Sequence, residues 1–375
     1  MPIAGIIAEY NPFHNGHAYQ LRRVRELGFA QTVVVMSGAF VQRGEPAVCD
    51  KRARVEMALR GGADLVLELP LRGVLSSAQG FAQSAVEVLC ATGVVSDLCF
   101  GSECGDLRRL EAVAQALCHP DFDAALVAEL AKGVSYPAAR QTALAPFCAD
   151  AALLKNPNDL LGVEYILAAK GRLIPHAIAR IGAAHDSTEE GSFGATRCRE
   201  LLKNGQSLGG LVPDFVSVEN PVFLSDMEPA MLARLRRLDA AYFAKLPDVS
   251  EGLENKLASA VREGCSLDEI IDAVKSKRYA RSRICRILMR AFLDVTEPAG
   301  APEYIRVLGF RKTSSGLLRQ MREQASLPIV QHPAVDGKDL AALAEEMAVN
   351  DVRAAFAKAV GAAGSDYREF PVVIE

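Results

Sequence analysis

The most constraining feature of this sequence is a short apolar run near its start that ends at a turn and continues into a helix. Residues 3–8 are apolar throughout and predict a buried strand. Asn11-Pro12 is a turn signal, and residues 18–27 then follow a helical pattern with charge on one face. The sequence therefore predicts a strand–turn–helix unit, which is the repeating element of open α/β sheets.

Two histidines lie in the turn of this unit. His14 and His17 flank Gly16 where the first strand hands over to the first helix. In open α/β sheets this place binds phosphates, because a helix N-terminus offers unpaired N–H donors and the positive end of a dipole. Imidazoles can add donors, and Gly16 would let the backbone come close to a phosphate. The residues alone leave two alternatives open, namely ordinary turn and cap residues or a pair of metal ligands.

The unit is followed by further alternation of strands and helices. Short β-branched or apolar runs predict strands, and runs with apolar positions three and four apart predict helices. The expected strands are 32–36, 63–70, 94–100 and 177–182, and the expected helices are 50–59, 78–91, 106–132 and 160–169. This pattern with short loops predicts an α/β protein with a doubly wound parallel sheet, a Rossmann-like arrangement.

Several cations lie where strands end or helices begin. Lys51 opens the helix 50–59, where a cation is unfavourable against the helix dipole unless an anion compensates it, and this marks Lys51 as a candidate functional residue. Arg43 follows the strand 32–36 in a glycine-punctuated loop and is either solvated or a phosphate clamp. Residues 185–187 and 191–194 lead to Thr196 and Arg199 in the first turn of another helix, which is either solvated or a second anion site.

The composition changes after residue 207, which predicts a boundary between residues 1–208 and residues 209–375. From about residue 228 the helical period dominates, so the second part is expected to be mainly helical. One helix in it carries five arginines without an acidic residue among them, Arg278, Arg281, Arg283, Arg286 and Arg290. Such a run can be a solvated face, can pack domains together, or can bind an RNA backbone.

Length and composition limit the classes of protein that fit. The 375 residues are half hydrophobic and carry a formal charge of −4, which indicates a globular chain whose nucleic-acid contacts would need a local basic patch. The nine cysteines have no metal-binding spacing and predict buried, reduced thiols in a cytoplasmic protein. No apolar run is long enough to cross a membrane. No P-loop or nucleophile-elbow motif is present, and nothing in the sequence predicts an oligomeric state.

Five stretches together resemble one family, the bacterial tRNA(Met) cytidine acetate ligases, within the nucleotidyltransferases that carry a His-x-Gly-His motif. They are residues 9–17 (EYNPFHNGH), 36–46 (MSGAFVQRGEP), 64–70 (DLVLELP), 157–162 (PNDLLG) and 304–310 (YIRVLGF). The resemblance implies an enzyme that acetylates N4 of the wobble cytidine of elongator tRNA-Met. It implies ATP and acetate as substrates, an acetyl-adenylate intermediate, a catalytic domain at 1–208 and a tRNA-binding domain at 209–375.

The catalytic candidates are His14, His17, Lys51 and Arg199, with Lys51 proposed from its place in its helix and not from the resemblance. The five arginines are the tRNA-binding candidates because of their charge pattern. The resemblance itself implies residues of the nucleotide site. The implied ATP-binding residues are Ile7, Ala8, Glu9, Tyr10, Asn11, Pro12, Phe13, His14, Asn15, Gly16, His17, Ala18, Tyr19, Gln20, Gly101, Asn158, Arg180, Thr196 and Arg199. Gly194 stands where the superfamily usually has a serine, so one hydroxyl contact is missing from the late motif.

Two other functions fit part of this pattern. A nucleotidyltransferase that makes a dinucleotide cofactor would share the histidine motif, but the long basic helical half argues against it. A non-catalytic nucleotide- or RNA-binding protein would keep the glycine loops and tolerate loss of the histidines, which are present. Mg²⁺ on the triphosphate is consistent with adenylation, although no carboxylate cluster marks a protein ligand set for a metal.

Overall fold

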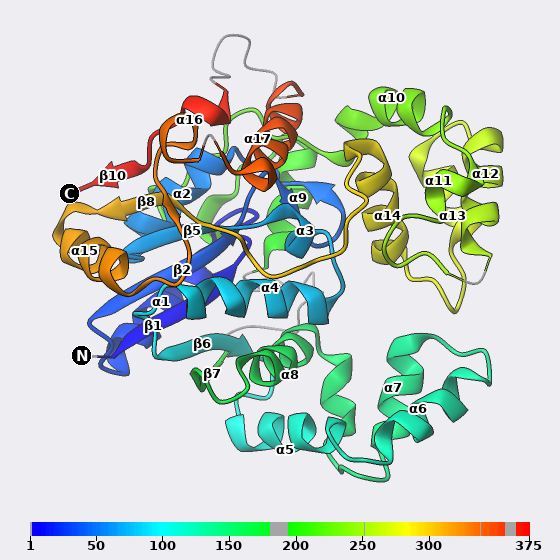
Figure 1. Cartoon of the computed structure of the whole chain (residues 1–375), viewed down its shortest axis with the longest axis horizontal. Coiled ribbons are helices and arrows are strands. Elements are labelled where there is room, and N and C mark those ends of the chain that lie inside the picture. Colours follow the sequence, from blue (N-terminus) through cyan, green and yellow to red (C-terminus); the bar gives the residue numbers. More distant parts are fainter. Residues whose placement is uncertain (1, 181–193, 251, 338, 357–364) are drawn as a thin grey trace.

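The computed structural model describes residues 2–180, 194–250, 252–337, 339–356 and 365–375, and its centre is a mostly parallel sheet (Figure 1). Five strands run parallel in the order β5-β2-β1-β6-β7. Their bounds are Ile3–Ala8 for β1, Gln31–Ser37 for β2, Leu65–Leu69 for β5, Asp97–Ser102 for β6 and Ile174–Ala179 for β7. The chain moves outward from β1 to β5 and then returns to β6 on the other side, so the predicted doubly wound sheet is confirmed.

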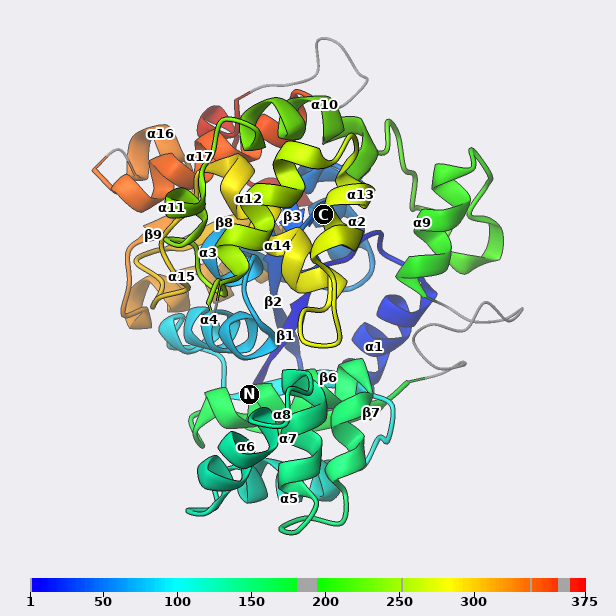
Figure 2. The ribbon, with the colours of Figure 1, turned by 90° about the vertical axis from the view of Figure 1, so that its right-hand side faces the viewer.

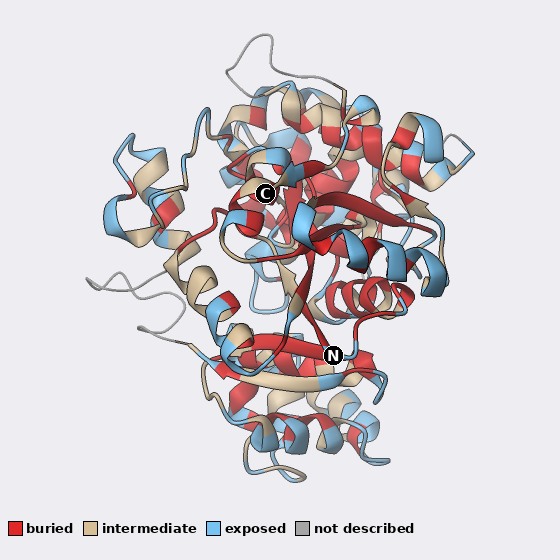
Figure 3. Ribbon diagram, turned by 90° about the vertical axis from the view of Figure 1, so that its left-hand side faces the viewer, coloured by how far each residue is buried: buried red, intermediate tan, exposed pale blue. Residues whose placement is uncertain are grey.

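The two faces of the sheet are covered by different helices. Alternate residues of β2 enter separate cores, with Val33 and Val35 in one and Val34 and Met36 in the other. The first core is completed by α4 (Ala78–Ala91) and α8 (Pro157–Ala169), and the second by α1 (Asn15–Glu26) and α2 (Lys51–Arg60). Figure 3 shows the buried strands running through the middle of the molecule. Near-continuous apolar strands are therefore explained by burial on both faces.

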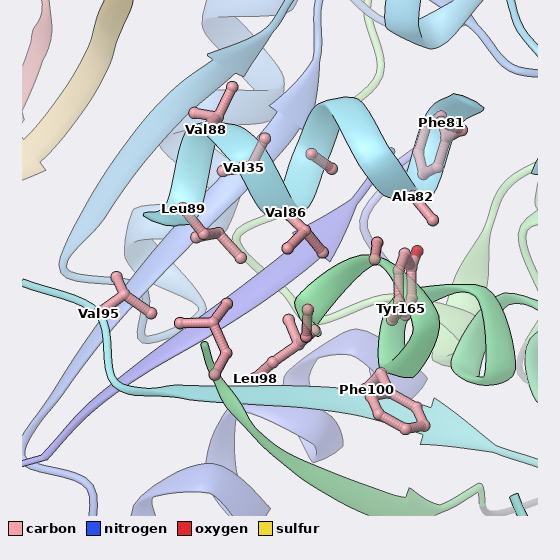
Figure 4. Packing of buried hydrophobic residues seen from close by; sticks show 14 of the residues in the cluster. Val35, Phe81, Ala82, Val86, Val88, Leu89, Val95, Leu98, Phe100 and Tyr165 are labelled. Atoms are coloured by element: carbon pink, nitrogen blue, oxygen red, sulfur yellow. The ribbon is translucent and has the colours of Figure 1, made fainter. Parts of the chain in front are cut away.

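Close packing of α4 against β1 depends on a glycine in the strand. A Cβ at Gly5 would lie 2.8 Å from Leu89 Cδ1 on α4, which is closer than such atoms approach. Figure 4 shows Val86 and Leu89 of α4 directed at the strands, with Phe100 of β6 and Tyr165 of α8 nearby. The same packing brings the first turn of α4 to the carboxyl ends of the strands.

The last part of the chain departs from the expected mainly helical second domain at 209–375. β8 (Ile305–Arg311) pairs antiparallel with β5, and β9 (Ile329–Val330) and β10 (Val372–Ile374) pair with β8. These strands extend the sheet of the first half, together with α15 (Ser315–Gln324), α16 (Pro333–Asp336) and α17 (Ala341–Ala354) beside it. Strand signals are weak in this part of the sequence, because β9 and β10 are very short and β8 carries arginines.

The helical part of the second half is confined to a smaller region. Its helices are α10 (Leu224–Leu235), α11 (Ala240–Phe243), α12 (Leu253–Glu263), α13 (Leu267–Val274) and α14 (Arg281–Leu293). Their core also contains Ala39, Phe40, Leu71 and Leu75, which belong to the first half of the chain. Figure 2 shows this helical region facing the viewer, above the group of α5 (Leu107–Leu117), α6 (Phe122–Leu130) and α7 (Tyr136–Leu144). No helix among the described residues is both long and apolar enough to cross a membrane.

Candidate active site

A cavity of about 290 Å³ lies at the carboxyl ends of β1 and β6. Ile7 and Ala8 from β1 and Phe100 and Gly101 from the end of β6 line it. These neighbouring strands are where the order of the sheet reverses, and ligands of doubly wound sheets bind at such a point. The topology thus places the predicted turn of α1 at the edge of a binding cavity.

Two backbone hydrogen bonds orient the paired histidines. The Gly16 N–H donates to His14 Nδ1 at 3.0 Å, and the His14 N–H donates to His17 Nδ1 at 3.2 Å. The rings are stacked with centroids 3.7 Å apart. Because each Nδ1 accepts a hydrogen bond, the proton of each neutral ring belongs on Nε2. The histidines therefore cap α1, as one of the alternatives held, and they also line the cavity.

The surroundings of His17 favour its neutral form. Burial lowers the pKa of His17 well below its usual 6.5, and the charge of Arg180 and the neighbouring His14, whenever His14 is protonated, lower it further. A neutral imidazole still offers its Nε2–H as a donor to a phosphate oxygen. A bound polyanion would raise the pKa again, because an opposite charge favours the protonated ring.

Three arginines reach the same cavity, Arg43, Arg180 and Arg199. Arg199 donates to the Asn11 carbonyl at 2.9 Å and to Thr196 Oγ1 at 3.2 Å, which ties the late motif to the first turn. Burial lowers the pKa of Arg199, and the charge of Arg43 lowers it further. Burial also lowers the pKa of Arg180. The positive charges of these partly buried arginines repel one another, and a bound anion would relieve this repulsion.

Backbone donors hold two carboxylates, Glu9 in the lining of the cavity and Glu103, which contacts the lining residue Asn158. Glu9 Oε1 accepts the Gln42 N–H at 2.7 Å, and burial raises the pKa of Glu9 against this bond and the nearby arginines. Glu103 accepts the N–H groups of Asn158 and Asp159 at the start of α8. Glu103 therefore caps the α8 N-terminus, and Asn158 contributes its side-chain oxygen, 3.4 Å from Arg180 Nη1.

Most of the ATP-binding residues expected from the sequence meet at this cavity. Those that line it are Ile7, Ala8, Glu9, Tyr10, Asn11, His14, His17, Gln20, Gly101, Asn158, Arg180, Thr196 and Arg199. Others of the 7–20 segment do not line it: Pro12, Phe13, Asn15, Gly16, Ala18 and Tyr19. Phe13 is fully buried in the α1 core, and Asn15 donates to the Gly210 carbonyl instead. Residues 185–187 and 191–193 lie outside the described residues.

Lys51 does not reach the cavity, and its expected catalytic role is not supported. Its ammonium lies 2.9 Å from Glu68 Oε1 and 2.7 Å from Asp366 Oδ2, and the side chain is buried. Arg306 of β8 joins the same two carboxylates. The negative charge that Lys51 requires at the start of its helix is therefore supplied by the protein itself, by Glu68 of β5 and by Asp366 near the end of the chain.

The five arginines of the basic helix fall into two groups. Arg290 is buried and donates to the carbonyls of Arg72, Leu75, Val295 and Glu297, so it is not available to RNA. Arg286 is largely buried, and its Nη1 lies 3.4 Å from the Gln42 carbonyl.

The other three lie toward the outer end of α14. Arg278 and Arg281 are exposed, and Arg283 is half-buried. Arg281 is paired with Asp268 of α13, and Arg283 donates to the Asp248 carbonyl. For Arg286 and Arg290 the packing alternative is therefore correct, and the RNA-binding expectation is limited to Arg278, Arg281 and Arg283.

Sequence reasoning missed one wall of the cavity. It is built from α4 and α8, with Ala78, Phe81, Leu160, Leu161 and Tyr165. These residues are spaced like any apolar helix face, so nothing in the sequence separates them from core residues. The hairpin of β3 (Phe40–Val41) and β4 (Glu45–Pro46) also lines the cavity, where the sequence predicted only a loop.

No group of three or more His, Cys, Asp or Glu side chains suitable for a metal ion is found within the described residues. All nine cysteines are free, but Cys118 and Cys265 are exposed, so the expectation of buried thiols is wrong for these two.

The fold and this site together define a nucleotidyltransferase. A family model described as HIGH Nucleotidyl Transferase matches residues 1–366, which is most of the chain.

Curated relatives of this chain share one name. The tRNA(Met) cytidine acetate ligase of Acetivibrio thermocellus is 36% identical over 364 residues, covering 88% of each chain. That of Thermotoga petrophila is 40% identical over 364 residues, covering 88% of this chain and 87% of the relative.

Solved structures agree with this. Thermotoga maritima TmcAL in its apo form I has 35% identity and a TM-score of 0.92 with both chains fully covered. The same protein bound with alpha-thio ATP has 35% identity and a TM-score of 0.89, covering 100% of this chain and 99% of that one. The chain belongs to the tRNA(Met) cytidine acetate ligase family of HIGH nucleotidyltransferases, as the resemblance in the sequence indicated.

Proposed function

We propose that this protein acetylates N4 of the wobble cytidine in elongator tRNA-Met, using ATP and acetate through an acetyl-adenylate. The observation that carries the proposal is the cavity at the switch point, where His14, His17, Arg43, Arg180 and Arg199 converge. Tetra-anionic ATP matches this concentration of donors and positive charge. The relatives' names supply the tRNA, the cytidine and the acetate, and the complex of TmcAL with alpha-thio ATP supports the nucleotide.

In the first step an acetate oxygen attacks the α-phosphorus of ATP. A bond from oxygen to phosphorus forms, and the bond from phosphorus to the bridging oxygen breaks, so that pyrophosphate leaves with the electron pair. Negative charge grows on the phosphate oxygens in the transition state. The Nε2–H donors of the histidines and the guanidinium of Arg199 stabilise this charge, and the fixed Nδ1 contacts keep the rings oriented beforehand.

In the second step the cytidine N4 amine attacks the acetyl carbon of the intermediate. The bond from that carbon to the adenylate oxygen breaks, AMP leaves with the electron pair, and the amine loses a proton. No covalent enzyme intermediate is required, which agrees with the absence of a recognisable nucleophile motif in the sequence.

The tRNA would meet the outer end of α14. Arg281 and Arg283 of α14, and Arg278 just before it, are exposed or half-buried. Arg281 already shares its charge with Asp268, so its contact with a phosphate would compete with that pair. We infer that residues 209–293 contribute tRNA contacts, whereas residues 305–375 complete the sheet.

We assign no protein ligands to Mg²⁺, because the described residues provide no suitable cluster. An accompanying ion would be held mainly by phosphate oxygens and water, as Mg²⁺ often is. Free thiols and a tRNA substrate both fit a cytoplasmic enzyme.

The test is a single incubation of the protein with ATP, labelled acetate and total tRNA. We expect the label in N4-acetylcytidine at the wobble position of elongator tRNA-Met, with release of AMP and pyrophosphate. Omission of acetate is the control. Labelling of another nucleoside would overturn the proposed substrate, and nucleotide transfer to a small molecule without acetate dependence would overturn the reaction.

A further inference from the structure

Between the ATP cavity and the helical region lies the hairpin of β3 and β4. Val41, Gln42, Arg43 and Glu45 of this hairpin line the cavity. The other side of the hairpin contacts α14, and Phe40 at its base is part of the helical core. The hairpin therefore belongs to both parts of the molecule.

Backbone meets backbone where the hairpin turn touches α14. Gly44 has φ of +77°, and a Cβ there would lie 2.4 Å from the Arg286 nitrogen and 2.5 Å from the Cys285 carbonyl carbon. A helix backbone cannot move aside as a flexible side chain can. The position of α14 therefore determines how near the hairpin turn can come.

Arg286 adds a polar contact to this backbone contact. It carries its guanidinium from α14 to the Gln42 carbonyl, with Nη1 3.4 Å from the oxygen, and its Nη2 lies 3.9 Å from Asp248 Oδ2. Burial lowers the pKa of Arg286, and Asp248 opposes this shift. Because moving a charged group out of water costs free energy, the buried guanidinium of Arg286 needs these contacts to stabilise it.

The contact continues into the cavity through Gln42. Its carbonyl faces Arg286, while its N–H donates to Glu9 Oε1 at 2.7 Å. Arg43 is the next residue, is exposed, and lines the cavity within reach of the charge of Arg199. Displacement of Gln42 would move Arg43 and release Glu9 together.

We propose that Arg286 and Gly44 are positioning residues for the ATP site: they lock the β3–β4 hairpin to α14 and so hold Arg43 against the bound triphosphate. Part of the helical region then supports the site of adenylation, in addition to any contacts that it makes with tRNA. The inference rests on the proposed ATP-dependent function. It concerns a step before tRNA is needed.

The experiment measures ATP binding by calorimetry and acetate-dependent exchange of pyrophosphate into ATP, both without tRNA. The variants are Arg286→Gln, Gly44→Ala, Arg43→Ala and the double variant Arg286→Gln/Arg43→Ala. Arg236→Gln is the matched control, because Arg236 also donates to a backbone carbonyl in the helical region, that of Gly264 at 3.0 Å, away from the hairpin.

We expect Arg286→Gln and Gly44→Ala each to raise the KM and Kd for ATP about tenfold, with a smaller change in kcat, and Arg236→Gln to change neither. If Arg286 acts through Arg43, the double variant should match Arg43→Ala within about twofold, because the effects of coupled residues do not add. Thermal unfolding of each variant identifies loss of folded protein, which would lower kcat per total protein while leaving KM unchanged.

Three results would overturn the inference. They are unchanged ATP affinity in both Arg286→Gln and Gly44→Ala, multiplied effects in the double variant, or a fall in kcat with normal KM that follows the loss of folded protein. Failure of the proposed function would look different, because the wild-type protein would then show no acetate-dependent exchange. The calorimetric comparison of variants would still decide the role of Arg286.

Discussion

The turn between β1 and α1 and the helix α14 were both expected to bind anions, but the turn has both of its histidines at a cavity, whereas part of α14 is buried in the protein. In the turn, His14 and His17 reach the cavity with their orientation fixed by their own backbone. In α14, Arg290 and Arg286 are directed into the protein, and the remaining arginines lie at the outer end. A motif whose geometry is local survives folding as predicted. A run of charge on a helix does not, because packing decides which side of the helix faces water.

The largest effect that would sharpen this comparison is expected at His17. His17→Ala removes an Nε2–H donor from the cavity and should lower acetyl-adenylate formation at least a hundredfold, measured by acetate-dependent exchange of pyrophosphate into ATP. The alanine also leaves the His14 N–H without its acceptor. Circular dichroism should therefore show that the fold is retained, and exchange at the wild-type rate in a folded variant would exclude the role.

Arg290 should give the next largest effect, on stability and not on binding. Arg290→Ala leaves four carbonyls without their charged donor in a buried place, and should reduce the free energy of unfolding by about 3 kcal/mol. Urea denaturation measures it.

The exposed Arg236→Ala is the comparison for Arg290, and it should cost less than about 1 kcal/mol. Near-native stability of Arg290→Ala together with weakened tRNA binding would show that Arg290 binds tRNA and does not stabilise the fold.

A smaller effect is expected at the outer end of α14. Changing Arg278, Arg281 and Arg283 together to Gln should weaken tRNA binding, and the slope of log affinity against log salt should fall by about one for each phosphate that the helix no longer neutralises. Filter binding at several salt concentrations measures both, and exchange without tRNA should persist because these side chains do not line the ATP cavity.

A charge-matched control separates local contacts from net charge. Lys312, Arg319 and Arg322 lie in and just before α15, at the opposite end of the molecule in Figure 1. Their triple change to Gln alters the net charge equally and should leave the salt slope unchanged. Equal effects of the two triple variants would show that α14 holds no particular tRNA site.

The smallest effect concerns pH. The pKa of His17 is well below 6.5 in the folded protein, so below pH 6.5 the unfolded chain binds a proton that the folded chain does not. Stability should therefore fall as the pH drops from about 7 to 5, by at most about 1.4 kcal/mol per pH unit from this group. Urea titrations of wild type and His17→Gln should differ in slope by about this amount. Parallel pH profiles would mean that folding does not lower the pKa of His17.

The sequence by itself determined the local parts of this protein. The bounds of β1 and α4 follow from runs of apolar residues, which are read within one element. Elsewhere the predicted bounds are wrong: the strands predicted at 94–100 and 177–182 are Asp97–Ser102 and Ile174–Ala179, and the helix predicted at 106–132 is divided into α5 and α6. The first turn was also predictable, since the cap that orients His14 and His17 involves residues at most three apart. The late motif was also found, because Thr196 and Arg199 lie within the first five residues of one helix.

Only the tertiary structure decided what depends on partners distant in sequence. Lys51 has the same position in its helix as a phosphate-binding cation would, but Asp366, 315 residues away, neutralises it together with Glu68. Phe81 and Tyr165 are apolar helix residues that become a cavity wall only because α4 and α8 meet at the end of β6. Charge and hydrophobicity are properties of a single residue, whereas burial and ion pairing depend on how the whole chain packs. Burial and pairing therefore cannot be predicted from the residue types alone.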